Sequence, residues 1–239
     1  MPQSFKDKQV LIAGGTGGLG RAVSLAFLGQ LAKVFVTYRV ESEFSALKTA
    51  ARASSLSLEG YQVDVTNEAA VGQFIEKLVS NHGRVDVLIN TIGAYAAGAP
   101  LWETEPKIFS RMLALNLHAG YLLARYVVPV MVRQRSGAIV NVAARAAFDH
   151  AAGAAAYAAS KAAAVAMMDS LAADLKGTGV RVNSVLPSII DTEANRKAMP
   201  QANFAKWPRP DDIARVILFL SGDEAKVIHG ASIPVYGES

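Results

Sequence analysis

A short apolar run, Gln9–Ala13, leads directly into the stretch Gly14-Gly15-Thr16-Gly17-Gly18-Leu19-Gly20, which contains five glycines. Glycine permits positive φ and lets backbone N–H groups approach a phosphate closely. The residues after this stretch are predicted to form a helix, and a helix N-terminus carries partial positive charge. We therefore expect a strand, turn and helix that bind the diphosphate of a dinucleotide, with a purely structural turn as the alternative. The residues expected to hold the cofactor here are Gly14, Thr16, Gly18, Leu19 and Gly20.

The rest of the chain alternates short β-branched runs with longer helical ones. The further predicted strands are Lys33–Thr37, Leu56–Val63, Asp86–Asn90, Ala138–Val142, Arg181–Leu186 and Ala231–Val235. The predicted helices are Gly18–Gly29, Glu41–Ala53, Asn67–Asn81, Pro106–Gln134, Gly153–Lys176 and Arg209–Leu220. Strands that are apolar without alternation are buried on both faces, which predicts a parallel sheet covered by helices on both sides. The expected fold is α/β, a single domain over residues 1–239 with a doubly wound sheet of about seven strands (the Rossmann fold).

Composition excludes several kinds of function. The chain has no cysteine, which rules out disulfides and thiolate metal sites, and its four histidines lack ligand spacing, so no metal is expected. The formal charge of +4 is spread along the chain without a dense basic run. A small-molecule ligand is therefore expected rather than nucleic acid. The polar start of the chain and the lack of a charge-free apolar stretch of about 20 residues predict a cytoplasmic protein without a membrane partner.

Tyr157 and Lys161 stand four residues apart in a predicted alanine-rich helix. This spacing places both side chains on one helix face, about one turn apart. A phenol ordinarily holds its proton until pH ~10, and a neighbouring ammonium group is expected to lower that pKa. A tyrosine tuned in this way can exchange a proton with a carbonyl or alcohol oxygen. The pair is therefore predicted to be a catalytic acid/base device.

The end of the second predicted strand, Thr37-Tyr38-Arg39, bears on the choice of cofactor. An acidic residue there would bind the ribose 2′-hydroxyl of NAD, whereas a basic residue would accept the 2′-phosphate of NADP. No acid occurs before Glu41, and the planar guanidinium of Arg39 suits a phosphate. We therefore expect NADP(H) in preference to NAD(H), with a solvated arginine at a strand end as the alternative.

With these motifs in place, the chain resembles the short-chain dehydrogenase/reductase family over essentially its whole length. The glycine spacing matches the family's cofactor turn, Tyr157 and Lys161 match its catalytic pair, and Asn90-Thr91-Ile92-Gly93 stands where the family has Asn-Asn-Ala-Gly. The resemblance implies a third catalytic residue, Asn116, and a lid over the substrate at residues 188–207. The further cofactor contacts that it implies are Asp64, Val65, Asn90, Gly93, Pro187, Ile190 and Thr192.

One position departs from the family pattern. The family places a serine thirteen residues before the tyrosine, where its hydroxyl binds the substrate oxygen, but this chain has Ala144 there. Losing one such donor costs roughly 10²–10³ in rate. The nearby Arg145, Asp149 and His150 are candidate replacements, although ordinary surface positions are the simpler expectation.

The dihydropteridine reductases, a branch of the family, also carry alanine at the serine position. Their lid resembles Leu186–Phe204, and Tyr95 stands where they have a tryptophan. An aromatic ring at that place can stack on a flat substrate, or it can belong to the core. The predicted substrate contacts are Tyr95, Ala144, Arg145, Tyr157 and Met199.

The function expected from the resemblance is NADPH-dependent transfer of a hydride to a small carbonyl or quinonoid substrate. An ordinary ketone or 3-oxoacyl reductase and a non-catalytic NADP(H)-binding sensor remain as alternatives. The segments Pro106–Gln134 and Gly153–Lys176 resemble the helices that form the family's four-helix interface. A homodimer or homotetramer is therefore expected.

Overall fold

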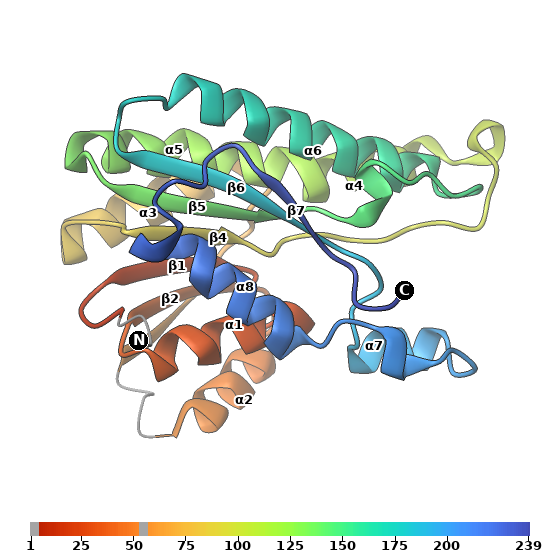
Figure 1. The fold of residues 1–239 in the computed structure, drawn as a ribbon, viewed down its shortest axis with the longest axis horizontal. Coiled ribbons are helices and arrows are strands. Elements are labelled where there is room, and N and C mark those ends of the chain that lie inside the picture. Colours follow the sequence, from red (N-terminus) through yellow and green to blue (C-terminus); the bar gives the residue numbers. More distant parts are fainter. Residues whose placement is uncertain (1–4, 53–56) are drawn as a thin grey trace.

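The structure is a computed structural model, and it describes residues 5–52 and 57–239. Within these residues a sheet of seven parallel strands is covered by helices on both faces (Figure 1). The strand order is β3-β2-β1-β4-β5-β6-β7. The predicted doubly wound fold is therefore confirmed. The order reverses between β1 and β4, and at such a point a crevice opens at the carboxyl ends of the strands.

The strands are short and mostly buried. Their bounds are β1 Gln9–Ala13, β2 Lys33–Tyr38, β3 Leu58–Gln62, β4 Val87–Asn90, β5 Gly137–Val142, β6 Val180–Pro187 and β7 Ser232–Val235. The predicted strands agree with these to within one or two residues at each described end, because a strand ends where its ladder hydrogen bonds end. The predicted start of the third strand, Leu56, lies outside the described residues.

The helices alternate with the strands. Their bounds are α1 Gly18–Gly29, α2 Glu41–Ala51, α3 Glu68–His82, α4 Pro106–Leu113, α5 Ala119–Gln134, α6 Ala155–Asp174, α7 Glu193–Ala198 and α8 Pro210–Ser221. Short 3₁₀ turns, among them η2 Leu101–Glu103, η4 Arg145–Ala147 and η5 Phe204–Lys206, lie in the connections. The predicted end of the second helix, Ala53, lies outside the described residues.

The predicted helix Pro106–Gln134 is continuous but not uniform. A π-helical turn, η3 Ala114–His118, separates α4 from α5. Among the described residues this stretch is the one helix long and apolar enough, by length and composition, to cross a membrane, yet half of the apolar window is buried inside the protein. A helix that packs against a sheet on one face and against other helices on another face can be as apolar as a membrane-spanning helix.

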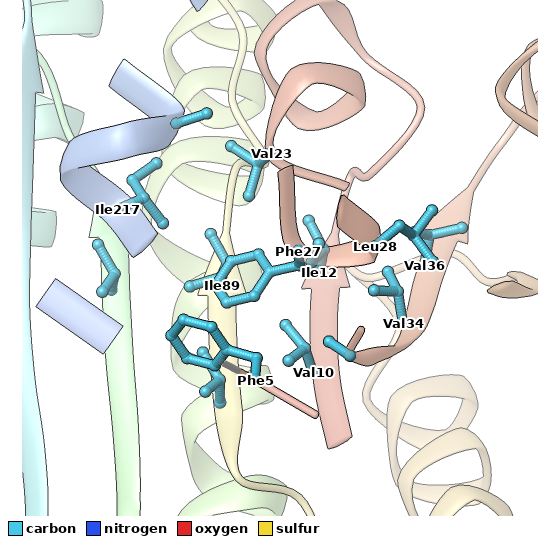
Figure 2. Packing of buried hydrophobic residues seen from close by; sticks show 14 of the residues in the cluster. Phe5, Val10, Ile12, Val23, Phe27, Leu28, Val34, Val36, Ile89 and Ile217 are labelled. Atoms are coloured by element: carbon cyan, nitrogen blue, oxygen red, sulfur yellow. The ribbon is translucent and has the colours of Figure 1, made fainter. Parts of the chain in front are cut away.

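Two apolar clusters fix the layers. One cluster joins α1, α2 and α8 to one face of the sheet, and the other joins α3, α5 and α6 to the opposite face. Figure 2 shows part of the first cluster, where Phe27 of α1 and Ile217 of α8 meet Ile12 and Ile89 of the sheet. Phe5 closes this cluster against Phe27, with ring centroids 4.9 Å apart. The buried sheet therefore forms a rigid base for the loops at its carboxyl edge.

Candidate functional site

The glycine turn between β1 and α1 has the shape of a phosphate cradle. Gly14 has a φ of +77°, and a Cβ on Gly20 would lie 2.0 Å from the carbonyl oxygen of Gly14. Gly17 caps α1 without any side-chain hydrogen bond, so the first N–H groups of the helix remain available to an anion. Leu19 is buried in the core, so this residue can offer only its backbone N–H. The turn thus fits the diphosphate of a dinucleotide.

The neighbouring strands hold this turn in place. The backbone N–H of Gly14 donates to Thr37 Oγ1 at 3.0 Å, and the hydroxyl of Thr91 donates to the carbonyl of Ala13 at 2.7 Å. Asn90, from the same Asn90–Gly93 segment, donates from Nδ2 to Asn141 Oδ1 at 3.0 Å. The threonine that departs from the family's Asn-Asn-Ala-Gly pattern therefore makes a direct bond to the cradle.

The end of β2 combines the expected cation with an acid that the sequence analysis did not anticipate. Arg39 is exposed, and its charge is among the causes that lower the pKa of Asp64, after the hydrogen bonds that Asp64 accepts from Thr66. The hydroxyl of Thr16 donates to Glu43 Oε2 at 3.0 Å. Glu43 was missed because it lies on α2, one turn beyond the strand end at which an acid is sought. The carboxylate of Glu43 thus reaches the glycine turn, while the guanidinium of Arg39 is exposed and acts on Asp64.

The predicted acid/base pair occupies the first half of α6. Tyr157 is half-buried, whereas Lys161 is only 5% exposed and donates from Nζ to the carbonyl of Val142 at 3.0 Å. Burial, with a contribution from Tyr95, raises the pKa of Tyr157 to about 12. Burial alone lowers the pKa of Lys161 to about 8. The predicted lowering of the tyrosine pKa is therefore wrong for this structure, because burial disfavours the charged form of the phenol.

Asn116 lies in the π-helical turn and joins two segments of the site. Its Oδ1 accepts from the N–H of Ala94 at 2.8 Å, while its Nδ2 donates to the carbonyl of Ala94 at 3.0 Å and to Ser160 Oγ at 2.9 Å. Ser160 Oγ in turn donates to the carbonyl of Tyr157 at 2.7 Å. A Cβ on Gly93 would lie 3.0 Å from Asn116 Oδ1 and 3.2 Å from Lys161 Nζ. The structure therefore brings Asn116, Gly93 and Lys161 together.

Ser160 is a member of this site that the sequence analysis missed. Its side chain is fully buried, between Asn116 and the backbone of Tyr157. The available clue was a hydroxyl residue at the third position after Tyr157, within a run that is otherwise almost entirely alanine.

Tyr95 lies against Tyr157. The two rings meet edge to face, with centroids 4.9 Å apart and an interplanar angle of 78°. Tyr95 is 71% exposed, so the alternative that it belongs to the core is wrong. An exposed ring beside Tyr157 lies where it can contact a substrate.

The alanine at the serine position is buried at the end of β5. Ala144 is 6% exposed and precedes the turn η4. The next residue, Arg145, donates from Nε to Asp149 Oδ2 at 2.8 Å, and its guanidinium lies over the ring of Tyr236, 5.3 Å from the centroid. Arg145 and Asp149 therefore neutralise each other, which disfavours both as replacements for the serine hydroxyl. His150 is exposed beyond them.

The predicted lid follows β6 and contains the short helix α7, which Figure 1 shows clear of the sheet and beside the C-terminus. Thr192 caps α7 and would be 2.8 Å, at its Cγ2, from a Cβ on Gly18, so the start of the lid touches the start of α1. Met199 ends α7 and is half-buried. Trp207 is buried and packs against Phe204, with ring centroids 5.0 Å apart, so it anchors the end of the lid.

The lid is also tied to the C-terminal residues. Ser188 Oγ donates to the carbonyl of Tyr236 at 2.6 Å and lies 2.7 Å from Ser239 Oγ. The N–H of Glu238 donates to the carbonyl of Lys206 at 3.0 Å. The last residues of the chain therefore fix both ends of the lid.

A separate hollow of about 610 Å³ lies at the opposite, amino-terminal edge of the sheet, between Lys8, Gly137 and Asp223. Arg181 lines it but donates to the carbonyls of Leu220 and Gly222 at 2.8 and 2.9 Å. This arginine therefore completes the end of α8. Within the described residues, no group of three or more His, Cys, Asp or Glu side chains could hold a metal ion.

Comparison with known proteins agrees with this geometry. Residues 8–203 match the family model described as short chain dehydrogenase. The chain is 31% identical over 241 residues to the 3-oxoacyl-[acyl-carrier-protein] reductase FabG of Thermotoga maritima, with 98% of each chain covered. It is 30% identical over 241 residues to meso-2,3-butanediol dehydrogenase of Serratia marcescens, covering 98% of this chain and 94% of that protein.

Among solved structures, ElxO with NADP bound superimposes with a TM-score of 0.91 at 28% identity, over 97% of this chain and 98% of that one. The family match spans the cradle, Asn116, Tyr157 and Lys161. The chain belongs to the short-chain dehydrogenase/reductase family of NAD(P)-dependent oxidoreductases.

Proposed function

We propose that this enzyme is an NADPH-dependent reductase of a small carbonyl or quinonoid compound, with Tyr157 as the proton donor. The observation that carries the proposal is the geometry around Gly93, where Asn116 and the buried Lys161 meet and where Asn116 is linked through Ser160 to the backbone of Tyr157. Tyr157 keeps its proton at neutral pH, and a protonated phenol is the form that donates in a reduction. The bound cofactor supplies the hydride.

Lys161 is proposed to hold the nicotinamide ribose. Its ammonium group is buried and has three hydrogens, and Val142 is its hydrogen-bond acceptor among the described residues. Two further donors therefore remain for ribose hydroxyl groups. The positive charge also favours the phenolate that remains when Tyr157 has given up its proton.

The remaining cofactor contacts are proposed to follow the matched motifs. Gly14, Thr16 and the start of α1 would hold the diphosphate, and Asp64 and Val65 would flank the adenine. Asn90 pairs with Ala13 directly before the glycine turn, and Gly93 lies beside Lys161. The contact of Thr192 with Gly18 supports a lid that closes over the cofactor. The segment after β6 would complete the cover with Pro187, Ile190 and Thr192.

NADP(H) is proposed as the preferred cofactor, with Arg39 on the 2′-phosphate. The similarity to ElxO, whose structure has NADP bound, supports this preference. Glu43 opposes it, because its carboxylate reaches Thr16 in the cradle and would repel a phosphate nearby. The proposed cofactor preference is therefore the outcome of two opposite charges, Glu43 on α2 and Arg39 directly after β2.

The substrate is proposed to be flat and quinonoid, as in the dihydropteridine reductases. Ala144 matches that branch, and the exposed ring of Tyr95 beside Tyr157 offers a surface for a planar ring. Arg145, which begins η4, and Met199, at the end of α7 in the lid, are proposed as further substrate contacts. A 3-oxoacyl or simple ketone reductase is the second candidate, because 3-oxoacyl reductase FabG covers 98% of this chain at 31% identity.

The sensor alternative is less favoured. The network of Ala94, Asn116, Ser160 and Tyr157 is complete, and a protein that only bound the dinucleotide would not need it. NADPH binding without turnover across a broad panel of ketones, quinones and quinonoid dihydropterins would support a sensor.

We further propose that residues 1–239 act as one cytoplasmic domain that assembles into a homodimer or homotetramer through α5 and α6. Tyr121 on α5 is 43% exposed, and together with Met167 of α6 it lines a hollow between these helices. A second copy would cover these side chains. Light scattering tests this assembly, and a monomer at micromolar concentration would contradict it.

The test of the proposed function is steady-state oxidation of NADPH with a panel of quinonoid dihydropterin, quinones, 3-oxoacyl esters and ketones. We expect turnover to be fastest with the quinonoid compounds. The Ala144→Ser variant distinguishes the two candidates, because a restored hydroxyl should help a simple ketone most. A large gain with ketones alone would favour the second candidate.

A further inference from the structure

The missing serine hydroxyl leaves a specific gap in the site. When a carbonyl is reduced, negative charge develops on its oxygen, and a second hydrogen-bond donor beside the proton donor stabilises that charge. Ala144 offers only a methyl group, and Arg145 is engaged by Asp149. The hydroxyl of Ser160 is also committed, because it donates to the carbonyl of Tyr157.

Tyr95 is a second phenol in contact with the proposed proton donor. Its ring contacts the ring of Tyr157 edge to face at 4.9 Å, and 71% of the residue is exposed. Its hydroxyl has no hydrogen-bond partner among the described residues, so it remains free to donate to a ligand. The two phenols also interact electrostatically, since Tyr95 is one cause of the raised pKa of Tyr157.

The backbone of Tyr95 is held relative to that of Tyr157. Asn116 binds both the N–H and the carbonyl of Ala94, the residue directly before Tyr95. The same amide donates to Ser160, which donates to the carbonyl of Tyr157. A chain of hydrogen bonds therefore ties the backbone before Tyr95 to the backbone of Tyr157, which keeps the two phenols on neighbouring supports as a two-donor site requires.

We propose that the hydroxyl of Tyr95 supplies the second hydrogen bond to the substrate oxygen, in place of the serine hydroxyl that Ala144 lacks. This inference rests on the proposed reductase function. The carbonyl carbon receives the hydride from the bound cofactor, and the electron pair of the C=O π bond forms the new O–H bond with the proton of Tyr157. Tyr95 keeps its own proton throughout, and the Tyr157 phenolate regains a proton from solvent.

The Tyr95→Phe variant separates this role from stacking, because phenylalanine keeps the ring and removes the donor. With the fastest quinonoid or ketone substrate of the panel, we expect kcat to fall about 10²-fold while KM changes little. Adding Ala144→Ser to Tyr95→Phe should restore roughly tenfold or more, because the serine hydroxyl returns a donor to the same oxygen. Ala144→Ser alone should give a much smaller gain.

The control is Tyr126→Phe, a matched substitution on α5 whose hydroxyl reaches Glu68 rather than the site. Its kcat should equal that of the unmodified enzyme. Thermal melting of each variant shows that the fold is retained. The dissociation constant of a hydroquinone in the presence of NADP⁺ measures the role of Tyr95 independently of kcat. Tyr95→Phe should weaken this binding about tenfold.

Unchanged kcat and unchanged hydroquinone affinity in Tyr95→Phe would overturn the inference, as would a loss that Ala144→Ser does not restore. If Tyr157→Phe abolishes turnover while Tyr95→Phe does not, the reductase function stands and only the role of Tyr95 fails. If neither variant changes turnover, the proposed proton donor fails as well.

Discussion

The ammonium group of Lys161 donates a 3.0 Å hydrogen bond to the carbonyl of Val142, and this contact fixes a buried cation one helical turn from Tyr157 on α6. Burial of the charge lowers the pKa of Lys161 from 10.5 to about 8. A cation held in such a place costs stability, and we expect the site to retain it because the reaction needs it.

Replacing this cation should therefore stabilise the fold while it destroys activity. The pKa lowering of Lys161 corresponds to roughly 3 kcal/mol of unfolding free energy below pH 8, and loss of the bond to Val142 offsets about 1 kcal/mol of that gain. We expect Lys161→Met to be about 1–2 kcal/mol more stable than the unmodified protein at pH 7. Urea unfolding measures the difference, with the exposed Lys77→Met on α3 as a neutral control.

The same variant has a defined pH dependence. Between pH 8 and pH 10.5 the unfolded chain binds the lysine proton and the folded protein does not, so the stability of the unmodified protein rises with pH in this window. The advantage of Lys161→Met should therefore shrink from pH 8 towards pH 10.5. A stability difference that stays constant over this range would contradict the buried charge.

Ser160→Ala should affect both catalysis and stability. It removes a buried acceptor of Asn116 Nδ2 and the donor of a part-buried hydrogen bond to the carbonyl of Tyr157. We expect a loss of about 1–3 kcal/mol in unfolding free energy and a fall in kcat of about tenfold or more, since Tyr157 is no longer held against its substrate. The Ser170→Ala variant, on the same helix α6 but near its end, should leave kcat unchanged. If Ser160→Ala lowers the unfolding free energy as expected but leaves kcat unchanged, Ser160 has no positioning role.

The opposite charges of Arg39 and Glu43 should act in opposite directions on cofactor binding. Arg39→Ala should weaken the binding of NADPH by about tenfold or more and leave the binding of NADH nearly unchanged, because the 2′-phosphate loses its ion pair. Glu43→Gln should strengthen the binding of NADPH, because it removes the negative charge of a carboxylate that reaches Thr16. Fluorescence titration with both cofactors measures each dissociation constant. Equal losses for NADPH and NADH in Arg39→Ala would refute the 2′-phosphate contact.

Two glycines of α1 form a matched pair. A Cβ on Gly20 would lie 2.0 Å from the carbonyl oxygen of Gly14, whereas a Cβ on Gly29 would meet nothing within 4 Å. Gly20→Ala should therefore abolish dinucleotide binding, while Gly29→Ala should keep it and stabilise the helix by up to about 1 kcal/mol. Retained cofactor affinity in Gly20→Ala, measured by titration, would show that α1 can move away from the cradle.

The sequence predicted the layers of this fold because short apolar runs without alternation indicate strands that are buried on both faces. The strand β1 and the helix α1 were predicted with the observed bounds, since glycine ends one and begins the other. The π-helical turn at Asn116 could not be predicted, because it depends on the bonds that the side chain makes with Ala94 and Ser160. Those partners lie more than twenty residues away in the sequence.

The sequence predicted which residues meet at the site better than it predicted their pKa values and charge pairings. Tyr157 and Lys161 are neighbours on α6 as expected, but the direction of the tyrosine pKa shift depends on burial, which no spacing reveals. Glu43 reaches the cradle from the next helix, and the pairing of Arg145 with Asp149 depends on the turn η4. Each of these relations exists only in the folded chain.

The most direct test of the account is the Tyr157→Phe variant, measured for both NADPH affinity and turnover. Phenylalanine keeps the ring that packs against Tyr95 and removes only the proton that the phenol donates. We expect NADPH affinity to stay nearly the same and kcat to fall by about 10²–10⁴-fold, the contribution of a general acid. An unchanged kcat with intact NADPH binding would contradict the assignment of Tyr157 as the proton donor.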